Sequence, residues 1–152
     1  MYPIRGVPFR LTDTPYTLLY RPRPFGDTQL ILALRDIETT TALAGEQLTL
    51  YRAQYGDEQQ FSHSASGPLG GVFRYPSSNA QIVFREHAGA IGVPVTSTFK
   101  VAAKTITGIR GAAYYHGYVE EAWITVLEQV GRRMREVGWV DLRVLEGGVR
   151  DG

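Results

Sequence analysis

The residues of this sequence that could do acid–base or metal chemistry are three histidines, His63, His87 and His116. Cysteine is absent, so a thiolate nucleophile, a disulfide and sulfur-bound zinc are excluded. His116 and Glu120 have the i, i+4 spacing of two metal ligands on one helix face, but Gly117 between them favours a helix boundary. We therefore predict no metal site and no cofactor.

A polar stretch in the middle of the chain holds the residue types of a hydrolase. Ser62 and His63 lie close to Asp57, but no Gly-x-Ser-x-Gly turn is present to expose a serine nucleophile. Gly67–Gly71 is rich in glycine but lacks the Gly-Lys-Ser/Thr ending of a phosphate loop. We predict no catalytic residues, and keep a small hydrolase centred on His63 or His87 as an alternative.

Three tyrosines lie close together near the C-terminal third of the chain: Tyr114, Tyr115 and Tyr118. Tyrosine rings stack on bases and sugars, and they also anchor protein interfaces. Base stacking calls for a basic groove alongside, which Lys100, Lys104 and Arg110 would have to line. We expect a protein interface here, with a carbohydrate- or nucleic-acid-binding module as the alternative.

The helical spacing that follows these tyrosines predicts one long amphipathic helix over about residues 118–137. Its apolar stripe has the i, i+3, i+4, i+7 period: Val119, Ala122, Trp123, Val126, Leu127, Val130, Met134 and Val137. Acidic Glu120 and Glu121 at its start and arginines at its end suit the helix dipole, and Gly138 suits its C-terminal cap. The alternation over residues 139–145 predicts a final strand.

The region before this helix reads as strand-rich. Alternating or β-branched runs predict strands at residues 29–36, 47–54, 72–75, 81–86, 95–101 and 105–109, with loops at 55–71 and 87–94. The predicted fold class is therefore α+β, with a mostly antiparallel or mixed sheet, the long helix and the final strand. A sandwich-like arrangement of residues 28–109 is the alternative.

The first 26 residues are predicted to form an extended arm. Five of the eight prolines lie in the first 24 residues, and each proline fixes φ and removes a backbone donor, which argues against a helix or a central strand. The arm is too aromatic to stay in solvent, so we expect it to lie on a neighbouring subunit, with packing on its own domain as the alternative. Its expected contact residues are Tyr2, Ile4, Arg5, Phe9, Arg10, Leu11, Tyr16, Arg21, Arg23 and Phe25. One domain at 27–146 and a flexible tail at 147–152 complete the predicted organisation.

Composition bounds the function. The net charge of +1 argues against a dedicated nucleic-acid surface, and no apolar run of membrane-spanning length or secretory signal is present. We expect cytoplasmic synthesis and a non-enzymatic assembly role, by self-association or by docking into a larger particle. The most specific expectation is a bacteriophage virion component, a neck or tail connector or a capsid-associated protein.

Overall fold

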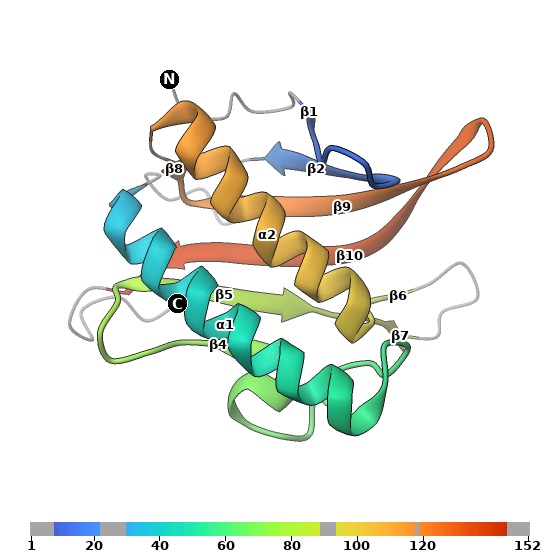
Figure 1. The fold of residues 1–152 in the computed structure, drawn as a ribbon, viewed down its shortest axis with the longest axis horizontal. Helices are drawn as coiled ribbons and strands as arrows, with labels where there is room; N and C mark the ends of the chain where they lie inside the picture. Colours follow the sequence, from blue (N-terminus) through green and yellow to red (C-terminus); the bar gives the residue numbers. More distant parts are fainter. Residues whose placement is uncertain (1–7, 22–29, 89–93, 118, 146–152) are drawn as a thin grey trace.

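The computed structural model describes residues 8–21, 30–88, 94–117 and 119–145. Within them the fold is α+β: a six-stranded antiparallel sheet with two α-helices across one of its faces (Figure 1). The order in this sheet is β1 (Pro8–Arg10), β2 (Tyr16–Arg21), β9 (Ala122–Val130), β10 (Arg133–Val144), β5 (Ala80–Arg85) and β4 (Val72–Phe73). Two small pairs join β3 (Ile31–Leu32) to β8 (Val119–Glu120), and β6 (His87–Ala88) to β7 (Pro94–Val95). The predicted fold class and antiparallel sheet are confirmed.

The predicted long helix over 118–137 is wrong, because the chain there forms β8, β9 and the first part of β10. In β9 the residues Ala122, Ile124 and Val126 point to the helix-covered face, and the alternate positions also carry apolar groups. Because apolar residues lie at both the odd and the even positions of β9, their spacing also matches the three-and-four period of a helix. Gly131 adopts φ of +62° in the two-residue turn that joins the strands, which fits a type II′ hairpin turn. The predicted strand at 139–145 corresponds to the last part of β10.

Helix α1 (Leu34–Tyr55) occupies the residues where strands were predicted at 29–36 and 47–54; only β3 is extended there. Its apolar residues recur at alternating steps of three and four, the period of a helix face. They are Leu34, Ile37, Thr41, Ala44, Leu48, Tyr51 and Tyr55. The Thr41 hydroxyl donates to the Ile37 carbonyl at 2.6 Å, so this β-branched residue satisfies its polar group inside the helix.

Helix α2 (Phe99–His116) replaces the strands predicted at 95–101 and 105–109, apart from the short β7. Thr98 caps the helix by accepting a hydrogen bond from the Val101 N–H at 3.2 Å, and Gly117 ends it at φ of +88°. Because α1 and the first part of α2 fall within residues 28–109, the sandwich alternative is also wrong. The predicted loop at 55–71 contains one short 3-10 helix, η1 (Gly67–Gly70).

The described part of the predicted arm is not separate from the domain. Strand β2 lies between β1 and β9, and its Leu18 is fully buried. Leu11 and Leu18 pack so closely on α2 that a Cβ at Gly108 would come within 2.8 and 2.9 Å of their methyl groups. Residues 8–21 are therefore part of the folded domain and supply Leu11, Tyr16, Leu18 and Tyr20 to its core, since no proline interrupts β2. Residues 1–7, 22–29 and the predicted tail at 147–152 lie outside the described residues.

Glu121, which the predicted helix assigned to a solvent-facing first turn, is instead 2% exposed and joins three segments. Its Oε1 accepts from the Leu30 N–H at 3.1 Å, and its Oε2 accepts from the Val144 N–H at 2.8 Å. The Glu121 N–H donates to the Leu30 carbonyl at 2.8 Å. This carboxylate therefore ties the entry to α1 and the end of β10 to the start of β9.

We predict that Leu18→Ala lowers the free energy of unfolding by about 2–4 kcal/mol, because it leaves a cavity between the sheet and α2. Leu19→Ala is the matched control: Leu19 is the next residue of β2, points to the opposite sheet face and is only partly buried. Urea titration of both variants measures the difference. Equal losses would contradict the placement of β2 in the core.

Candidate functional site

The β9–β10 hairpin extends beyond the strands on either side of it. Strand β2 pairs with β9 only as far as Glu128, and β5 pairs with β10 only from Trp139 onward. The hairpin itself continues to the Val130–Arg133 pair (Figure 1). A register shift between Glu136 and Gly138 marks the place where β10 leaves the sheet, as a β-bulge does. The outer part of the hairpin is thus a two-stranded ribbon.

Both faces of this ribbon carry exposed apolar side chains. Val130 is 50% exposed and Met134 is 47% exposed, and the register places them on opposite faces. Arg133 and Arg135 lie on the Val130 face, where Arg135 is bound to Glu128 at 2.7 Å, whereas Met134 is paired with Gln129 on the other face. Among the described residues, Arg132 and Arg133 have no carboxylate within ion-pair distance. The ribbon thus exposes an apolar side chain on each face and carries the arginines of its paired strands on the Val130 face.

The predicted arm contacts divide into three groups. Leu11 and Tyr16 are 7% and 4% exposed and are held by the chain's own core, so they are not available to a partner. Phe9 is half-buried, whereas Arg10 and Arg21 are exposed. The remaining predicted contacts, Tyr2, Ile4, Arg5, Arg23 and Phe25, lie outside the described residues.

Two groups that were predicted separately meet at the end of α2. The Phe9 ring lies 6.3 Å from the Tyr115 ring and 6.3 Å from the His116 ring. Tyr115 is 73% exposed and Tyr114 is 50% exposed, with the Arg110 guanidinium 5.7 Å from the Tyr114 ring centroid. Strand β1, at the edge of the sheet, and α2 thus share one exposed aromatic surface. Tyr118 lies outside the described residues.

The cations of the binding-module alternative lie on the solvent-facing side of α2. Lys100, Lys104 and Arg110 are all exposed; Lys100 shares a helix face with Lys104, and Arg110 shares one with Tyr114, but the step between the two pairs leaves that face. Lys100 also lines a cavity near the start of α2. The binding-module hypothesis stays untested.

That polar cavity, of about 410 Å³, lies at the base of the hairpin. The groups that line it are Tyr16, Glu58, Gln60, Thr96, Thr98, Lys100, Val101, Glu128, Arg135, Glu136 and Val137. The first N–H groups of α2 do not open into it as an anion site, because Phe99 and Lys100 donate to the Gln59 and Asp57 carbonyls at 2.8 and 3.0 Å.

The electrostatics of this cavity raise the pKa of the Tyr16 hydroxyl. The largest cause is burial, which disfavours the phenolate; the charge of Glu128 and its hydrogen bond to Tyr16 follow, and Glu58 adds a smaller effect. Arg135 acts in the opposite direction and lowers the pKa. The cavity thus holds Tyr16 in its neutral form, as a hydrogen-bond donor beside Glu128.

A second cavity of about 410 Å³ contains His63, the centre of the hydrolase alternative. The His63 Nε2 atom lies 4.0 Å from a Glu86 carboxylate oxygen, too far for a hydrogen bond. Ser62 and Ser64 bind each other at 3.0 Å, and neither lines this cavity. The His87 side chain lies outside the described part. Among the described residues, no three histidines or carboxylates are grouped to hold a metal ion.

Comparisons with known protein families, with curated proteins and with solved structures found no match. Among the described residues, neither helix is both long and apolar enough to cross a membrane.

The sequence reasoning missed the hairpin residues, since it placed them inside a helix. Val130-Gly131-Arg132-Arg133 carried a usable signal, because a glycine at the first central position is typical of a type II′ turn between two β-prone runs.

We predict opposite effects of two substitutions on Tyr16. Glu128→Gln lowers the pKa of Tyr16 toward its usual value, and Arg135→Ala raises it further, because each removes one of the two opposing charges. NMR titration of the labelled tyrosine ring carbons measures both shifts, with Tyr16→Phe to assign the signal. Shifts in the same direction would contradict the cavity geometry.

The raised pKa values of Tyr16 and of two further tyrosines determine how the free energy of unfolding changes at alkaline pH. Burial raises the pKa of Tyr20 as well, and raises the pKa of Tyr75 to about 12. A raised pKa in the folded state gives stability that is complete below the unfolded pKa of about 10 and is lost as the pH rises above it. Glu128→Gln lowers the pKa of Tyr16 and should therefore reduce the loss in free energy of unfolding as the pH rises into the alkaline range.

Proposed function

We propose that this chain is a non-enzymatic assembly subunit that associates with copies of itself through the β9–β10 hairpin. One observation carries the proposal: the hairpin continues past both neighbouring strands and exposes Val130 and Met134 at its end. A single exposed apolar residue on a flat surface is ordinary, but a projecting ribbon that exposes one on each face can bury both in a partner. Arginine is the charged residue most enriched in protein interfaces.

The proposed action is mechanical. The ribbon enters a groove on the next copy and buries the two apolar side chains, while Arg132 and Arg133 pair with acidic groups at the groove's edge. The hairpin and the groove are different surfaces, so the contact is heterologous. Contacts of this kind repeat to form a closed ring or an open filament.

The setting of the assembly is a narrower proposal. A bacteriophage virion, with the chain as a neck, tail or capsid-associated component made in the cytoplasm, stays a prediction that neither the fold nor the comparisons test. We propose the hairpin as the contact surface in place of the N-terminal arm that the sequence predicted, because the described part of the arm is built into the sheet.

We predict that the wild-type chain forms species larger than a dimer, and that the double variant Val130→Ser/Met134→Ser loses them. Both side chains are about half exposed, so the substitutions change the free energy of unfolding by no more than about 0.5 kcal/mol each. Sedimentation velocity over a range of concentrations measures the species, and electron microscopy shows their form.

Ile31→Ser is the matched control, because Ile31 is 61% exposed but lies in β3, outside the hairpin. This variant should keep the large species. The proposal fails if the wild-type chain never exceeds a dimer, or if the hairpin variant assembles as the wild type does.

A further inference from the structure

The outer surface of the helix layer carries a second, separate pattern. Of the seven large apolar residues that are exposed in the described part of the chain, four lie on the two helices: Leu50 at 63%, Tyr55 at 45%, Tyr114 at 50% and Tyr115 at 73%. The hairpin lies at the edge of the molecule, whereas these residues lie on the helices that cover the sheet (Figure 1). Exposed apolar groups in one layer call for a partner surface.

The charges on the two helices are of opposite sign. Helix α2 contains three permanently cationic side chains, Lys100, Lys104 and Arg110, and no carboxylate. Helix α1 contains Asp36, Glu38 and Glu46, against Arg35 and Arg52.

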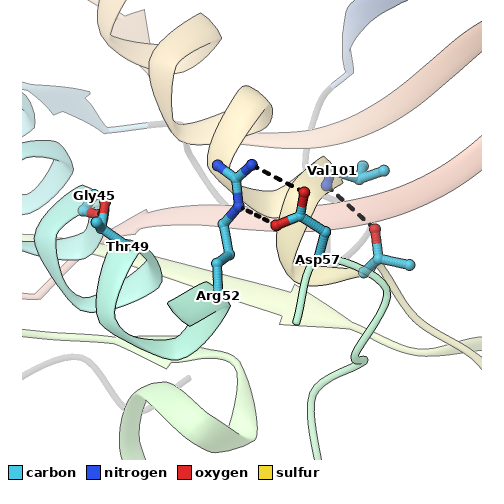
Figure 2. Close-up of polar contacts among 6 residues, drawn as sticks. Gly45, Thr49, Arg52, Asp57 and Val101 are labelled. Carbon is cyan, nitrogen blue, oxygen red and sulfur yellow. Dashed lines mark hydrogen bonds and ion pairs between the residues drawn. The ribbon is translucent and has the colours of Figure 1, made fainter. Parts of the chain in front are cut away.

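Arg52 is not available to offset the acids of α1. Its Nε and Nη2 atoms donate to the two oxygens of the Asp57 carboxylate at 2.8 and 3.3 Å (Figure 2). This bond raises the pKa of Arg52 and lowers the pKa of Asp57, as expected for a bidentate ion pair. Glu46, one turn before Leu50, is exposed and has no cation within ion-pair distance among the described residues.

The helices run antiparallel, and their contacts determine which residues of α1 and α2 lie at the same height along the helix axes. The Phe99 ring at the start of α2 lies 5.7 Å from the Tyr51 ring near the end of α1. Lys104 follows Phe99 by five residues and Glu46 precedes Tyr51 by five residues. Since each residue rises about 1.5 Å along a helix, Lys104 and Glu46 lie at the same height.

We propose that the helix layer packs face to face on the helix layer of a second copy of this chain, about a two-fold axis parallel to the helices. Such an axis keeps every residue at its own height and places α2 of one copy over α1 of the other. Lys104 then faces Glu46 of the partner subunit. An axis perpendicular to the helices in the same plane would instead stack α1 on α1 and α2 on α2, with like charges opposed. The charge pattern therefore selects both the partner and the symmetry.

The apolar groups and the area fit this arrangement. Leu50 is level with Lys100, whose aliphatic stem can cover it across the interface. The 22 residues of α1 span about 33 Å, and two helices side by side are about 20 Å wide. Each copy therefore offers an area of about 600 Å² when the helix layer is treated as a flat surface. A standard stable interface uses about 800 Å² per partner.

A second copy fits this surface better than a nucleic acid does. A phosphate chain on α2 would lie next to the carboxylates of α1, one helix diameter away, and the chain as a whole carries a charge of only +1. The contact rests on the proposed assembly function, for which it names one partner, but it uses residues outside the hairpin.

Charge reversal on the full chain tests the proposal. Lys104→Glu alone and Glu46→Lys alone each place like charges at two symmetric positions, so each should weaken the dimer by about tenfold or more. The double variant Lys104→Glu/Glu46→Lys should restore the wild-type mass profile in sedimentation equilibrium. Arg74→Glu, a reversal at an exposed position outside the helices, should leave the dimer intact.

The outcomes separate this contact from the hairpin. Val130→Ser/Met134→Ser should lose the large species and keep the dimer, whereas Lys104→Glu should lose the dimer. The proposal is overturned if the wild-type chain does not dimerise, or if the double reversal fails to rescue. It is equally overturned if a DNA or RNA oligonucleotide binds the monomer and Lys104→Glu abolishes that binding.

Discussion

The antiparallel pairing of β9 with β10 is the interaction on which the rest of the structure depends. These two strands are at the centre of the six-stranded sheet and supply four fully buried apolar side chains, Ile124, Val126, Val140 and Leu142. The same ladder then leaves the sheet at the bulge before Gly138 and continues as a solvent-exposed ribbon. Because one antiparallel ladder runs through the core and the projection, the body determines the direction in which the hairpin projects. A paired ribbon loses less conformational entropy on docking than an unpaired loop of the same length.

The helix layer depends on the same pair of strands. Helix α2 approaches the sheet so closely at Gly108 that no larger residue fits there without displacing Leu11 and Leu18. That contact fixes which side of α2 is buried, and therefore which side presents Lys104 and Tyr114 to solvent. The aromatic contacts of Phe99 with α1 then fix the height of one helix relative to the other. Core packing thus determines the arrangement of charges on the outer surface.

The fold class could be predicted from the sequence, but most element types could not. Residues 80–85 were predictable as β5 because Ile82, Val83 and Phe84 form a strongly β-prone run. At 34–55 the three-and-four spacing of Leu34, Ile37, Thr41, Ala44 and Leu48 was present, yet local alternation and threonine content favoured strands. At 118–137 the error was the reverse: a strand with apolar groups on both faces satisfies a helical period as well. Only the turn glycine, Gly131, distinguished a pair of strands from one long helix. The sequence singled out Tyr114 and Tyr115, which are exposed at the end of α2, whereas the hairpin was hidden by the wrong element.

The central claim is that the outer hairpin is the surface by which copies of this chain assemble, and hydrogen–deuterium exchange at increasing protein concentration tests it most directly. Backbone amides of residues 129–136 should exchange quickly at low concentration and become protected as large species form, while amides of 122–127 and 139–143 stay protected throughout. If the large species form and the exchange of 129–136 does not change, another part of the molecule makes the contact and the account is wrong.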